Sequence, residues 1–371
     1  MLVLLLAQCK QEYDPHVEAK TTGLLVVEGF INSGQGPTTI HLSRSSGLED
    51  NALKPEYGAQ VNVEGQDGSS FSLFDYGNGE YTNPQITLND GVQYRLHMRA
   101  TDGKEYVSDY SAVKHTPVID SITWQRENDG VQIYVNTHDD QNSTKYYRWS
   151  YSETWEFHSA FVSNLDWVWN PVTNRAVDVV NRPDPDAIYK CWKTQQSTNI
   201  ILGSSEKLTQ DKIFFPIRYI EPLGEELGIR YYIELTQYAL SHDAYLFYQR
   251  IKKNTEQIGT LFDPQPSQLT TNIHCTTDAN EEVIGFVEVI DQQQSHIYIT
   301  NDQVQPWLPP VPCSKFTYHN DTATLGPIGS GYLPLAPLSY FGPKIDKFEA
   351  APRECVDCTL RGTNVKPAFW P

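Results

Sequence analysis

Cys355 and Cys358, near the C-terminal end, are the most closely spaced cysteines in the sequence. Thiols at this CxxC spacing can bind zinc, act as a redox pair or form disulfides. A structural zinc site needs four ligands, and the sequence has neither a second CxxC nor a matching pair of histidines. A thioredoxin-like pair would lie between a strand and a helix, whereas this one precedes TLRGTNVKPAFWP, which we expect to be coil. Disulfides are the favoured interpretation if the chain is exported.

The cysteine at position 9 ends a short apolar run, MLVLLLAQC, that is too short for a membrane helix. The order LAQC is similar to a bacterial lipobox, a signal at which the preceding peptide is removed and the thiol is acylated. We therefore predict a signal peptide remnant over 1–8, a diacylglycerol and acyl modification at Cys9, and a lipidated tether over 9–22. Several fatty chains are enough for stable membrane anchoring. The alternative is an ordinary secretion signal in which Cys9 is incidental.

Without Cys9 the sequence contains an odd number of cysteines. The remaining ones, all candidates for disulfides, are Cys191, Cys275, Cys313, Cys355 and Cys358. At least one thiol must then stay free or pair outside the chain. The preferred pairings join Cys191 to Cys275, and Cys313 to one member of the CxxC.

Histidines and carboxylates give no comparable signal. The ten histidines form no HExxH motif, and we predict no metal site and no cofactor. Asp139-Asp140 and Asp184-Pro185-Asp186 could bind calcium, but neither matches an EF-hand loop, and solvated turns are the favoured interpretation. The sequence lacks a GxSxG motif, a P-loop and a dinucleotide fingerprint. We therefore predict no catalytic residue and no enzyme, although a hydrolase is not excluded.

Aromatic residues are concentrated between positions 146 and 169. A strand places alternate residues on one face, so Tyr147, Trp149 and Tyr151 align, and we expect them in a core. Exposed aromatic residues can stack on sugar rings or form interface hot spots. Three further tryptophans border a loop expected over 170–190, and we predict them as exposed contacts for a ligand or a partner: Trp155, Trp167 and Trp169.

The composition of the chain limits its partners and its fold. Its 28 basic and 46 acidic residues give a formal net charge of −18, and clustered lysines and arginines of the kind that bind phosphate backbones are missing. Nucleic acid is therefore an unlikely partner. Abundant aromatic residues, 23 glycines and 23 prolines favour a mostly β protein with many turns.

The elements that must position these residues are short alternating segments. Runs such as LLVVEGFI, TTIHLSRS and AQVNVEG predict an N-terminal prealbumin-like or immunoglobulin-like β-sandwich over 23–114. Within it, Gly77-Asn78-Gly79 predicts a turn between two aromatic strands. A new series begins after His115-Thr116-Pro117 and predicts a larger β-sandwich domain over 115–371. One helix is expected inside it, over 241–259, with Ser241 as its N-cap.

These pieces together resemble the domain of unknown function 4249 family of Bacteroidota lipoproteins. The resemblance is carried by LLLAQC, LVVEGFI, PVIDSITW, the CW at 191–192, LSHDAYLFYQRIKKNTEQIGTLFDPQPSQLTTNIHC and the closing CVDCTLRGTNVKPAFW. It implies an outer-membrane lipoprotein, anchored by lipid and facing the cell exterior. It also implies a partner, a TonB-dependent (SusC-like) outer-membrane β-barrel, with an accessory role in nutrient uptake and a small nutrient ligand.

The function expected on this basis is substrate capture or gating for the barrel, without chemistry on the ligand. One alternative is a surface hydrolase acting on glycans or peptides, which would need a cleft with paired carboxylates. Another is an adhesin or structural module of the cell surface. The sequence does not identify the substrate.

Overall fold

The computed structural model describes most of the chain in two compact units. The described residues are 23–46, 54–256, 270–310 and 312–371. Unit 1 holds those of Met1–Lys114 and Ser267–Ile290, and unit 2 holds those of His115–Pro266 and Asp291–Pro371. The predicted signal remnant 1–8 and the tether 9–22, with Cys9, lie outside the described residues. In the described ranges no helix is both long and apolar enough to cross a membrane.

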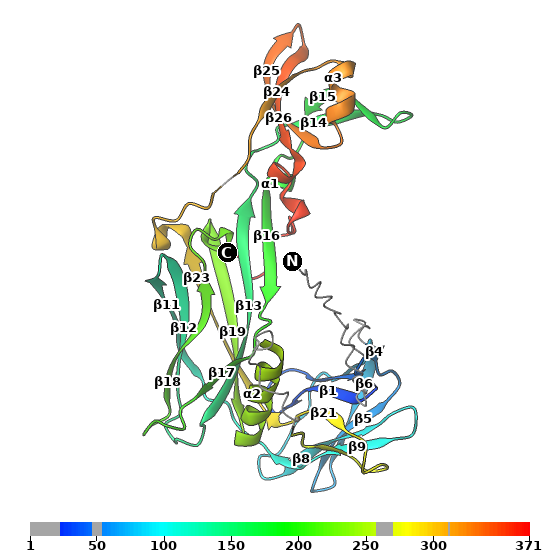
Figure 1. Cartoon of the computed structure of the whole chain (residues 1–371), viewed down its shortest axis with the longest axis vertical. Coiled ribbons are helices and arrows are strands. Elements are labelled where there is room, and N and C mark those ends of the chain that lie inside the picture. The colour runs from blue at the N-terminus through cyan, green and yellow to red at the C-terminus, as the bar shows by residue number, and fades with distance from the viewer. Residues whose placement is uncertain (1–22, 47–53, 257–269, 311) are drawn as a thin grey trace, which may run out of the picture. The chain divides into compact units, whose positions relative to one another are not determined.

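Unit 1 is a β-sandwich of short, mostly antiparallel strands with alternating burial (Figure 1). Its strands are β1 (Leu25–Gly29), β2 (Ile31–Asn32), β3 (Thr38–Arg44), β4 (Lys54–Pro55), β5 (Gln60–Gly65), β6 (Ser70–Gly77), β7 (Glu80–Asn83), β8 (Gln93–Arg99), β9 (Glu105–Ser108), β10 (Ser111–Ala112), β20 (Ile273–Cys275), β21 (Val283–Gly285) and β22 (Val289–Ile290). The hydrogen-bonded order is β20-β9-β8-β5-β6-β7-β3-β1-β21. The first half of β6 pairs with β5 and its second half with β7, so this strand joins the two layers.

A tight turn predicted from Gly77-Asn78-Gly79 connects β6 to β7. All three residues have positive φ, at 89°, 52° and 76°, which glycine and asparagine adopt more readily than other residues. Gly79 is also required sterically, because a Cβ there would lie 2.2 Å from the carbonyl oxygen of Leu42. The local sequence therefore fixes this hairpin.

The chain returns to unit 1 after leaving it, which corrects the continuous C-terminal domain expected over 115–371. The predicted boundary between 114 and 115 coincides with the division of the two units, but residues 267–290 belong to unit 1. On this return, β20 pairs with β9, β21 lies parallel to β1, and β22 lies parallel to β2. Its apolar side chains, such as Ile273 and Val289, are buried in the core of unit 1. The return covers sheet edges that would otherwise be open.

Unit 2 contains a second sandwich. Its strands are β11 (Ile119–Glu127), β12 (Gly130–His138), β13 (Tyr146–His158), β16 (Lys190–Gln196), β17 (Ile201–Ser204), β18 (Lys212–Ile220), β19 (Arg230–Leu240) and β23 (Gln292–Thr300). One sheet has the order β11-β12-β18 and the other β16-β13-β19-β23, with β17 also paired to β13. Their facing side chains form one apolar core that includes Tyr147 and Trp149. Tyr151 packs against that core while partly exposed, as the alternation predicts.

The helix predicted over 241–259 is α2 (His242–Glu256). The amide of Ala244 donates to the hydroxyl of Ser241 at 3.1 Å, so Ser241 caps the helix as expected. Ala244 and Phe247 are its buried residues. Residues 257–259 lie outside the described residues.

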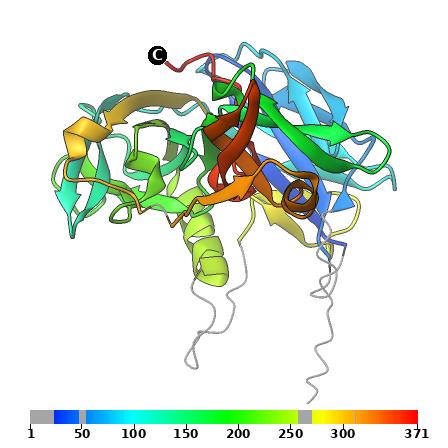
Figure 2. The same ribbon diagram turned by 90° about the horizontal axis from the view of Figure 1, so that it is seen from above.

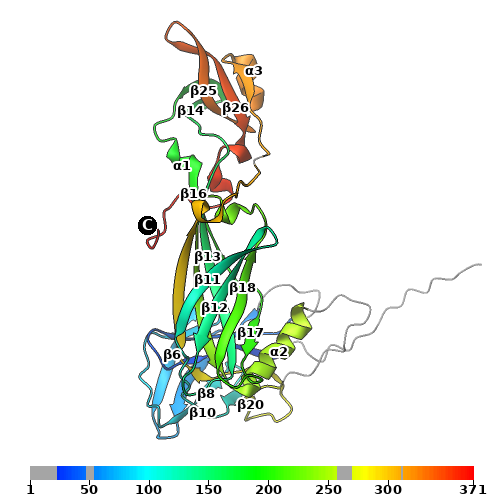
Figure 3. The ribbon, with the colours of Figure 1, turned by 90° about the vertical axis from the view of Figure 1, so that its left-hand side faces the viewer.

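A lobe of strands lies at one end of unit 2 (Figures 1 and 3). It consists of β14 (Leu165–Asn170), β15 (Arg175–Asn181), β24 (Phe316–His319), β25 (Tyr332–Phe341), β26 (Lys344–Pro352) and α3 (Thr322–Ile328), with α1 (Asp186–Tyr189) close by. β14 pairs with β15, and β26 lies between β24 and β25. Figure 2, which looks down on this end, shows α3 end-on beside the strands. Short 3₁₀ turns occur at Glu225–Leu227, Asn301–Val304, Arg353–Cys355 and Cys358–Leu360.

The predicted fold class is confirmed: the chain is mostly β, with two sandwich units and one longer helix in the second. The loop expected over 170–190 is wrong in part, because β15 and α1 lie within it. The segment RAVDVVN alternates weakly, but it pairs with β14 across a polar turn and buries Ala176 and Val179 in the lobe.

Candidate functional site

The cysteines of the predicted CxxC form disulfides with two different partners. Cys191 pairs with Cys358, and Cys313 pairs with Cys355. The pairing expected between Cys191 and Cys275 is wrong, whereas Cys313 does pair with one member of the CxxC. Cys275 is the free thiol among the described cysteines, and it is buried in the core of unit 1. Cys191 belongs to unit 2 and Cys275 to unit 1.

Two of the three tryptophans predicted as exposed contacts are buried. Trp155 is 3% exposed because β13 continues to His158 and extends the buried alternation of its face. Trp167 is 6% exposed; its indole N–H donates to the carbonyl of Tyr332 at 2.9 Å within the lobe. Trp169 is 43% exposed, and of the three it alone remains available to a partner.

A cavity of about 890 Å³ lies in unit 2, between the end of the sandwich and the lobe. Segments far apart in the sequence contribute to its lining, namely 156–160, 223–229, 309–310, 312–316, Tyr332 and 352–361. The disulfide between Cys313 and Cys355 forms part of the wall and joins two of these segments. Its volume is in the range of sites for small molecules, about 300–1,000 Å³.

Two glutamates in the cavity are each held by a tryptophan and by a second side chain, a histidine or an arginine. Glu156 accepts a hydrogen bond from the indole of Trp370 at 3.1 Å, and its other oxygen lies 3.1 Å from Nε2 of His158. Glu225 accepts from the indole of Trp155 at 3.4 Å and forms an ion pair with Arg361. Both carboxylates are therefore oriented by neighbours before any ligand arrives.

The rest of the lining is largely apolar. Prolines 309, 310, 312 and 352 surround the cavity together with Leu223, Phe157, Phe316 and Tyr332. Leu223 and Phe316 are 46% and 47% exposed, so apolar surface is open to solvent at the cavity. An apolar wall with a few fixed polar groups is typical of a ligand site.

The C-terminal segment packs against the sandwich of unit 2 beside this cavity. The backbone of Thr363 exchanges two hydrogen bonds with Trp192, at 2.8 and 2.9 Å. This close approach requires Gly362, because a Cβ there would lie 2.5 Å from the carbonyl oxygen of Trp192. Trp370 then reaches Glu156, and the guanidinium of Arg361 lies 4.6 Å from the ring centre of Phe157.

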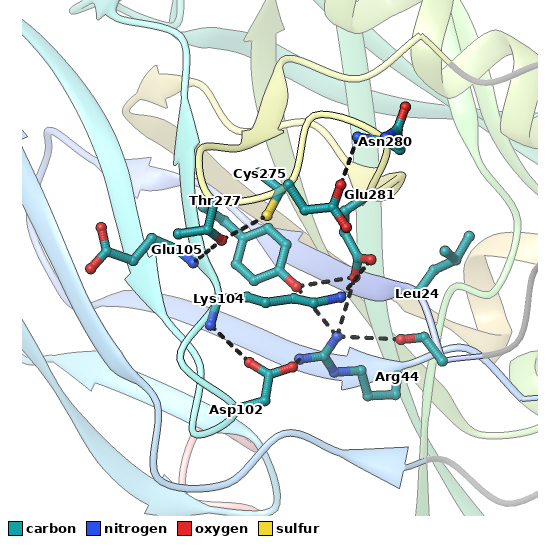
Figure 4. A network of polar contacts seen from close by, with 12 residues as sticks. Leu24, Arg44, Asp102, Lys104, Glu105, Cys275, Thr277, Asn280 and Glu281 are labelled. Carbon is teal, nitrogen blue, oxygen red and sulfur yellow. Dashed lines mark hydrogen bonds and ion pairs between the residues drawn. The ribbon is translucent and has the colours of Figure 1, made fainter.

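Unit 1 has a second cavity of about 690 Å³, and its lining is polar (Figure 4). Arg44 of β3 forms an ion pair with Glu56 at 2.6 Å, and Lys104 forms one with Glu281 at 2.6 Å. Tyr106 donates to the other oxygen of Glu281 at 3.2 Å. The residues labelled in Figure 4 come from the part of unit 1 before Lys114 and from the returning segment, and their charged groups mainly pair with one another.

The electrostatics of this network favour the charged forms of its cations. Burial disfavours a charged Arg44, but its hydrogen bonds to Glu56 and Tyr106 outweigh burial and raise its pKa above the ordinary value. The hydrogen bond to Glu281 raises the pKa of Lys104. Because Arg44 and Lys104 already have partners, we interpret the network as structural: its ion pairs and hydrogen bonds attach the returning segment to the rest of the sandwich.

In the first acidic turn singled out in the sequence, the carboxylate of Asp139 is used within the turn itself. Asp139 accepts hydrogen bonds from the amides of Gln141, Ser143 and Thr144 and from the Ser143 hydroxyl. The carboxylate oxygens of Asp139 therefore accept hydrogen bonds from within the turn. Within the described residues no group of three or more His, Cys, Asp or Glu side chains could hold a metal ion.

Sequence reasoning missed the cavity because its lining comes from five separate segments. The available signal was indirect: the CxxC and the closing CVDCTLRGTNVKPAFW contribute Cys355, Arg361 and Trp370. The proline-rich stretch before Cys313 gave a second signal, since it forms one wall.

The comparisons with known proteins identify a family. The model of the family DUF4249, described as a domain of unknown function, matches residues 10–296, and the chain belongs to this family. No curated protein matches the chain. Among solved structures, a segment of chicken tenascin with two fibronectin type III domains is similar, at 10% sequence identity and a TM-score of 0.17. The match covers 58% of this chain and 90% of the tenascin segment. A putative carbohydrate-binding protein from Bacteroides uniformis is 11% identical, with coverage of 59% and 91% and a TM-score of 0.15.

Proposed function

We propose that this member of the DUF4249 family is a non-catalytic binding protein that captures a small nutrient in the cavity of unit 2. We further propose that Cys9 anchors it by lipid to the outer membrane, facing the exterior, where it serves a TonB-dependent β-barrel. The observation that carries the binding role is the 890 Å³ cavity with apolar walls and oriented carboxylates.

The cavity is built to keep its shape without a ligand. The Cys313–Cys355 disulfide lies in its wall, and Cys358, three positions further on, is tied to Cys191 at the edge of β16. Glu156 and Glu225 have their hydrogen-bond partners in place. A preformed site loses less conformational entropy on binding, which favours capture of dilute ligands.

Contact with the barrel is assigned to the exposed apolar residues of the lobe. Trp169 is 43% exposed on β14, and Val172 in the following turn is 91% exposed. Tyr340 and Phe341, at the turn between β25 and β26, are 60% and 83% exposed. Exposed aromatic residues of this kind are enriched at protein interfaces.

The binding role is tested with a variant that fills the cavity. Ser314 lines the cavity and is exposed, so Ser314→Trp adds bulk there without disturbing a core. Ser330→Trp, at an exposed position after α3, is the matched control. The full chain is screened against amino acids, short peptides, monosaccharides and oligosaccharides. We expect a hit that Ser314→Trp abolishes and Ser330→Trp retains; a hit equally retained by both variants contradicts the assignment.

The barrel is tested separately by purification of the tagged chain from detergent-solubilised outer membranes of its host. A TonB-dependent barrel identified by mass spectrometry, with recovery reduced by Trp169→Ala, supports the partnership. A chain recovered alone in mild detergent counts against it. Products released from a glycan or peptide in the same screen would favour a hydrolase instead.

A further inference from the structure

We infer that the ligand of the unit 2 cavity is an organic cation carried on an apolar or aromatic body. This inference rests on the proposed function, since it names the chemical class captured at the same site. It follows from the charges, the free carboxylate and the walls of the cavity.

The charges of the lining are mainly negative. Carboxylates are supplied by Glu156, Glu225 and Glu354, and one guanidinium by Arg361. The chain as a whole also carries a formal charge of −18. Apolar walls of low polarisability strengthen the field of these groups inside the cavity, which raises the local concentration of cations.

Arg361 is not free to receive an anion. It forms an ion pair with Glu225, and its guanidinium lies over the ring of Phe157 with 4.6 Å to the ring centre. An anionic ligand would have to displace Glu225 and then meet the remaining carboxylates. A cation meets no such obstacle.

Glu354 is the carboxylate that a ligand can use. It lies in the 3₁₀ turn Arg353–Cys355, is exposed, and has neither a hydrogen bond nor an ion pair to another described residue. Its backbone neighbour Cys355 is fixed by the disulfide to Cys313. The free carboxylate is thus held at the cavity by a rigid segment.

Proline and aromatic side chains in the cavity wall match the apolar part of the ligand. Pro309, Pro310 and Pro312 line the cavity on one segment, and Phe316 and Tyr332 come from β24 and β25. Flat apolar rings of this kind pack against an aliphatic or aromatic body, and the faces of Phe316 and Tyr332 attract a neighbouring ammonium group.

The experiment compares three probes that share one body and differ in charge: 4-phenylbutylamine, 4-phenylbutanol and 4-phenylbutyrate. A capped Phe-Lys dipeptide amide is added to distinguish a lysine side chain from a free amine as the source of the cation. Each probe is titrated into the full chain, and binding is read from tryptophan fluorescence, because Trp155 and Trp370 donate to carboxylates of the cavity.

The variant Glu354→Gln keeps the shape of the side chain and removes its charge. Its matched control is Glu221→Gln, an exposed glutamate of unit 2 that does not line the cavity. We expect the amine to bind more tightly than the alcohol, and the carboxylate most weakly. Glu354→Gln should weaken amine binding roughly fivefold and leave the alcohol unchanged, whereas Glu221→Gln should change neither.

Three results would overturn the inference. The first is 4-phenylbutanol or 4-phenylbutyrate binding as tightly as 4-phenylbutylamine. The second is an equal effect of the two glutamine variants, and the third is no effect of Glu354→Gln on binding of the amine. The proposed function fails in a different way, when no probe and no compound of the nutrient screen binds at the cavity. Tighter binding of the dipeptide or of the free amine identifies the source, and either outcome supports the cationic class.

Discussion

The turn between β12 and β13 offers a sharp test of the physical reasoning, because one carboxylate organises it. Asp139 accepts hydrogen bonds from the amides of Gln141, Ser143 and Thr144 at 2.9, 2.9 and 2.8 Å, and from the Ser143 hydroxyl at 2.7 Å. Partial burial disfavours the charged form, but these bonds outweigh it and lower the pKa of Asp139 to about 2. The neighbouring Asp140 is 92% exposed.

The size of the effect follows from the pKa difference. A carboxyl group with a pKa near 3.8 in the unfolded chain and about 2 in the folded one stabilises the fold by about 2.4 kcal/mol at neutral pH. Solvent screens this partly exposed turn, and we reduce the expected contribution to about 1 kcal/mol. Asp139→Asn keeps the shape but replaces charge-assisted hydrogen bonds by weaker neutral ones. We therefore expect it to lower the free energy of unfolding of unit 2 by about 1 kcal/mol at pH 7.

The pH dependence has a definite sign. Because the folded pKa lies below the unfolded one, the contribution of Asp139 is fully present above the unfolded pKa of about 3.8. It is lost as the pH falls through about 2, where the folded carboxylate is protonated. The difference in stability between the parent and Asp139→Asn should therefore stay constant from pH 7 to 5 and shrink below pH 4.

Urea unfolding followed by tryptophan fluorescence measures this difference. All eight tryptophans of the sequence lie in the ranges assigned to unit 2, so the signal reports on the unit that contains the turn. Asp140→Asn is the matched control and should stay within about 0.5 kcal/mol of the parent. Calcium should not change the result, since the oxygens of Asp139 are occupied by the turn. A difference that persists undiminished at pH 3, or an equal loss in Asp140→Asn, would refute the reasoning.

Three further substitutions address the disulfides, a buried charge and the tryptophans. Cys191→Ser opens a disulfide with a sequence separation of 167 and should lower the unfolding free energy of unit 2 by about 4 kcal/mol; an unchanged urea midpoint under oxidising conditions contradicts this. Glu153→Ala leaves the guanidinium of Arg218, 3.0 Å away, without its buried partner and should lower the unfolding free energy by about 3–5 kcal/mol in the same assay. An unfolding free energy equal to that of the parent contradicts this. Trp167→Ala should cost at least about 3 kcal/mol and Trp169→Ala less than about 1 kcal/mol, and a reversed order in thermal unfolding would show that their burial is misassigned.

Local patterns predicted the parts of the fold that depend on local physics. The alternation through Tyr147, Trp149 and Tyr151 identified a strand and its buried face, since period-two burial needs no knowledge of the partner strand. Ser241 identified the start of α2 because an N-cap acts on amides within one turn. The glycine-rich turn at Gly77–Gly79 identified a hairpin for the same reason.

The errors arose where distant segments decide the outcome. The return of residues 267–290 to unit 1 depends on open edges of β1 and β9, which no local pattern reveals. Cys275 was expected to pair with Cys191, but it is a free thiol buried in the core of unit 1, and Cys191 pairs with Cys358 of unit 2. Trp167 was expected to be exposed because it borders the loop expected over 170–190, whereas Tyr332 and Phe348, more than 160 residues away in the sequence, help to bury it in the lobe.

The structure gives the CxxC motif at Cys355 and Cys358 a structural role. The CxxC spacing allowed zinc, redox or disulfide chemistry, and disulfides were the favoured interpretation; each of its cysteines forms a disulfide with a different segment of unit 2. Glu354, just before these cysteines, and Arg361, just after them, line the cavity, and Trp370 donates a hydrogen bond to Glu156. The pattern thus fixes charged groups around the cavity of unit 2. In the proposed function, the two disulfides hold the positions at which the ligand is recognised.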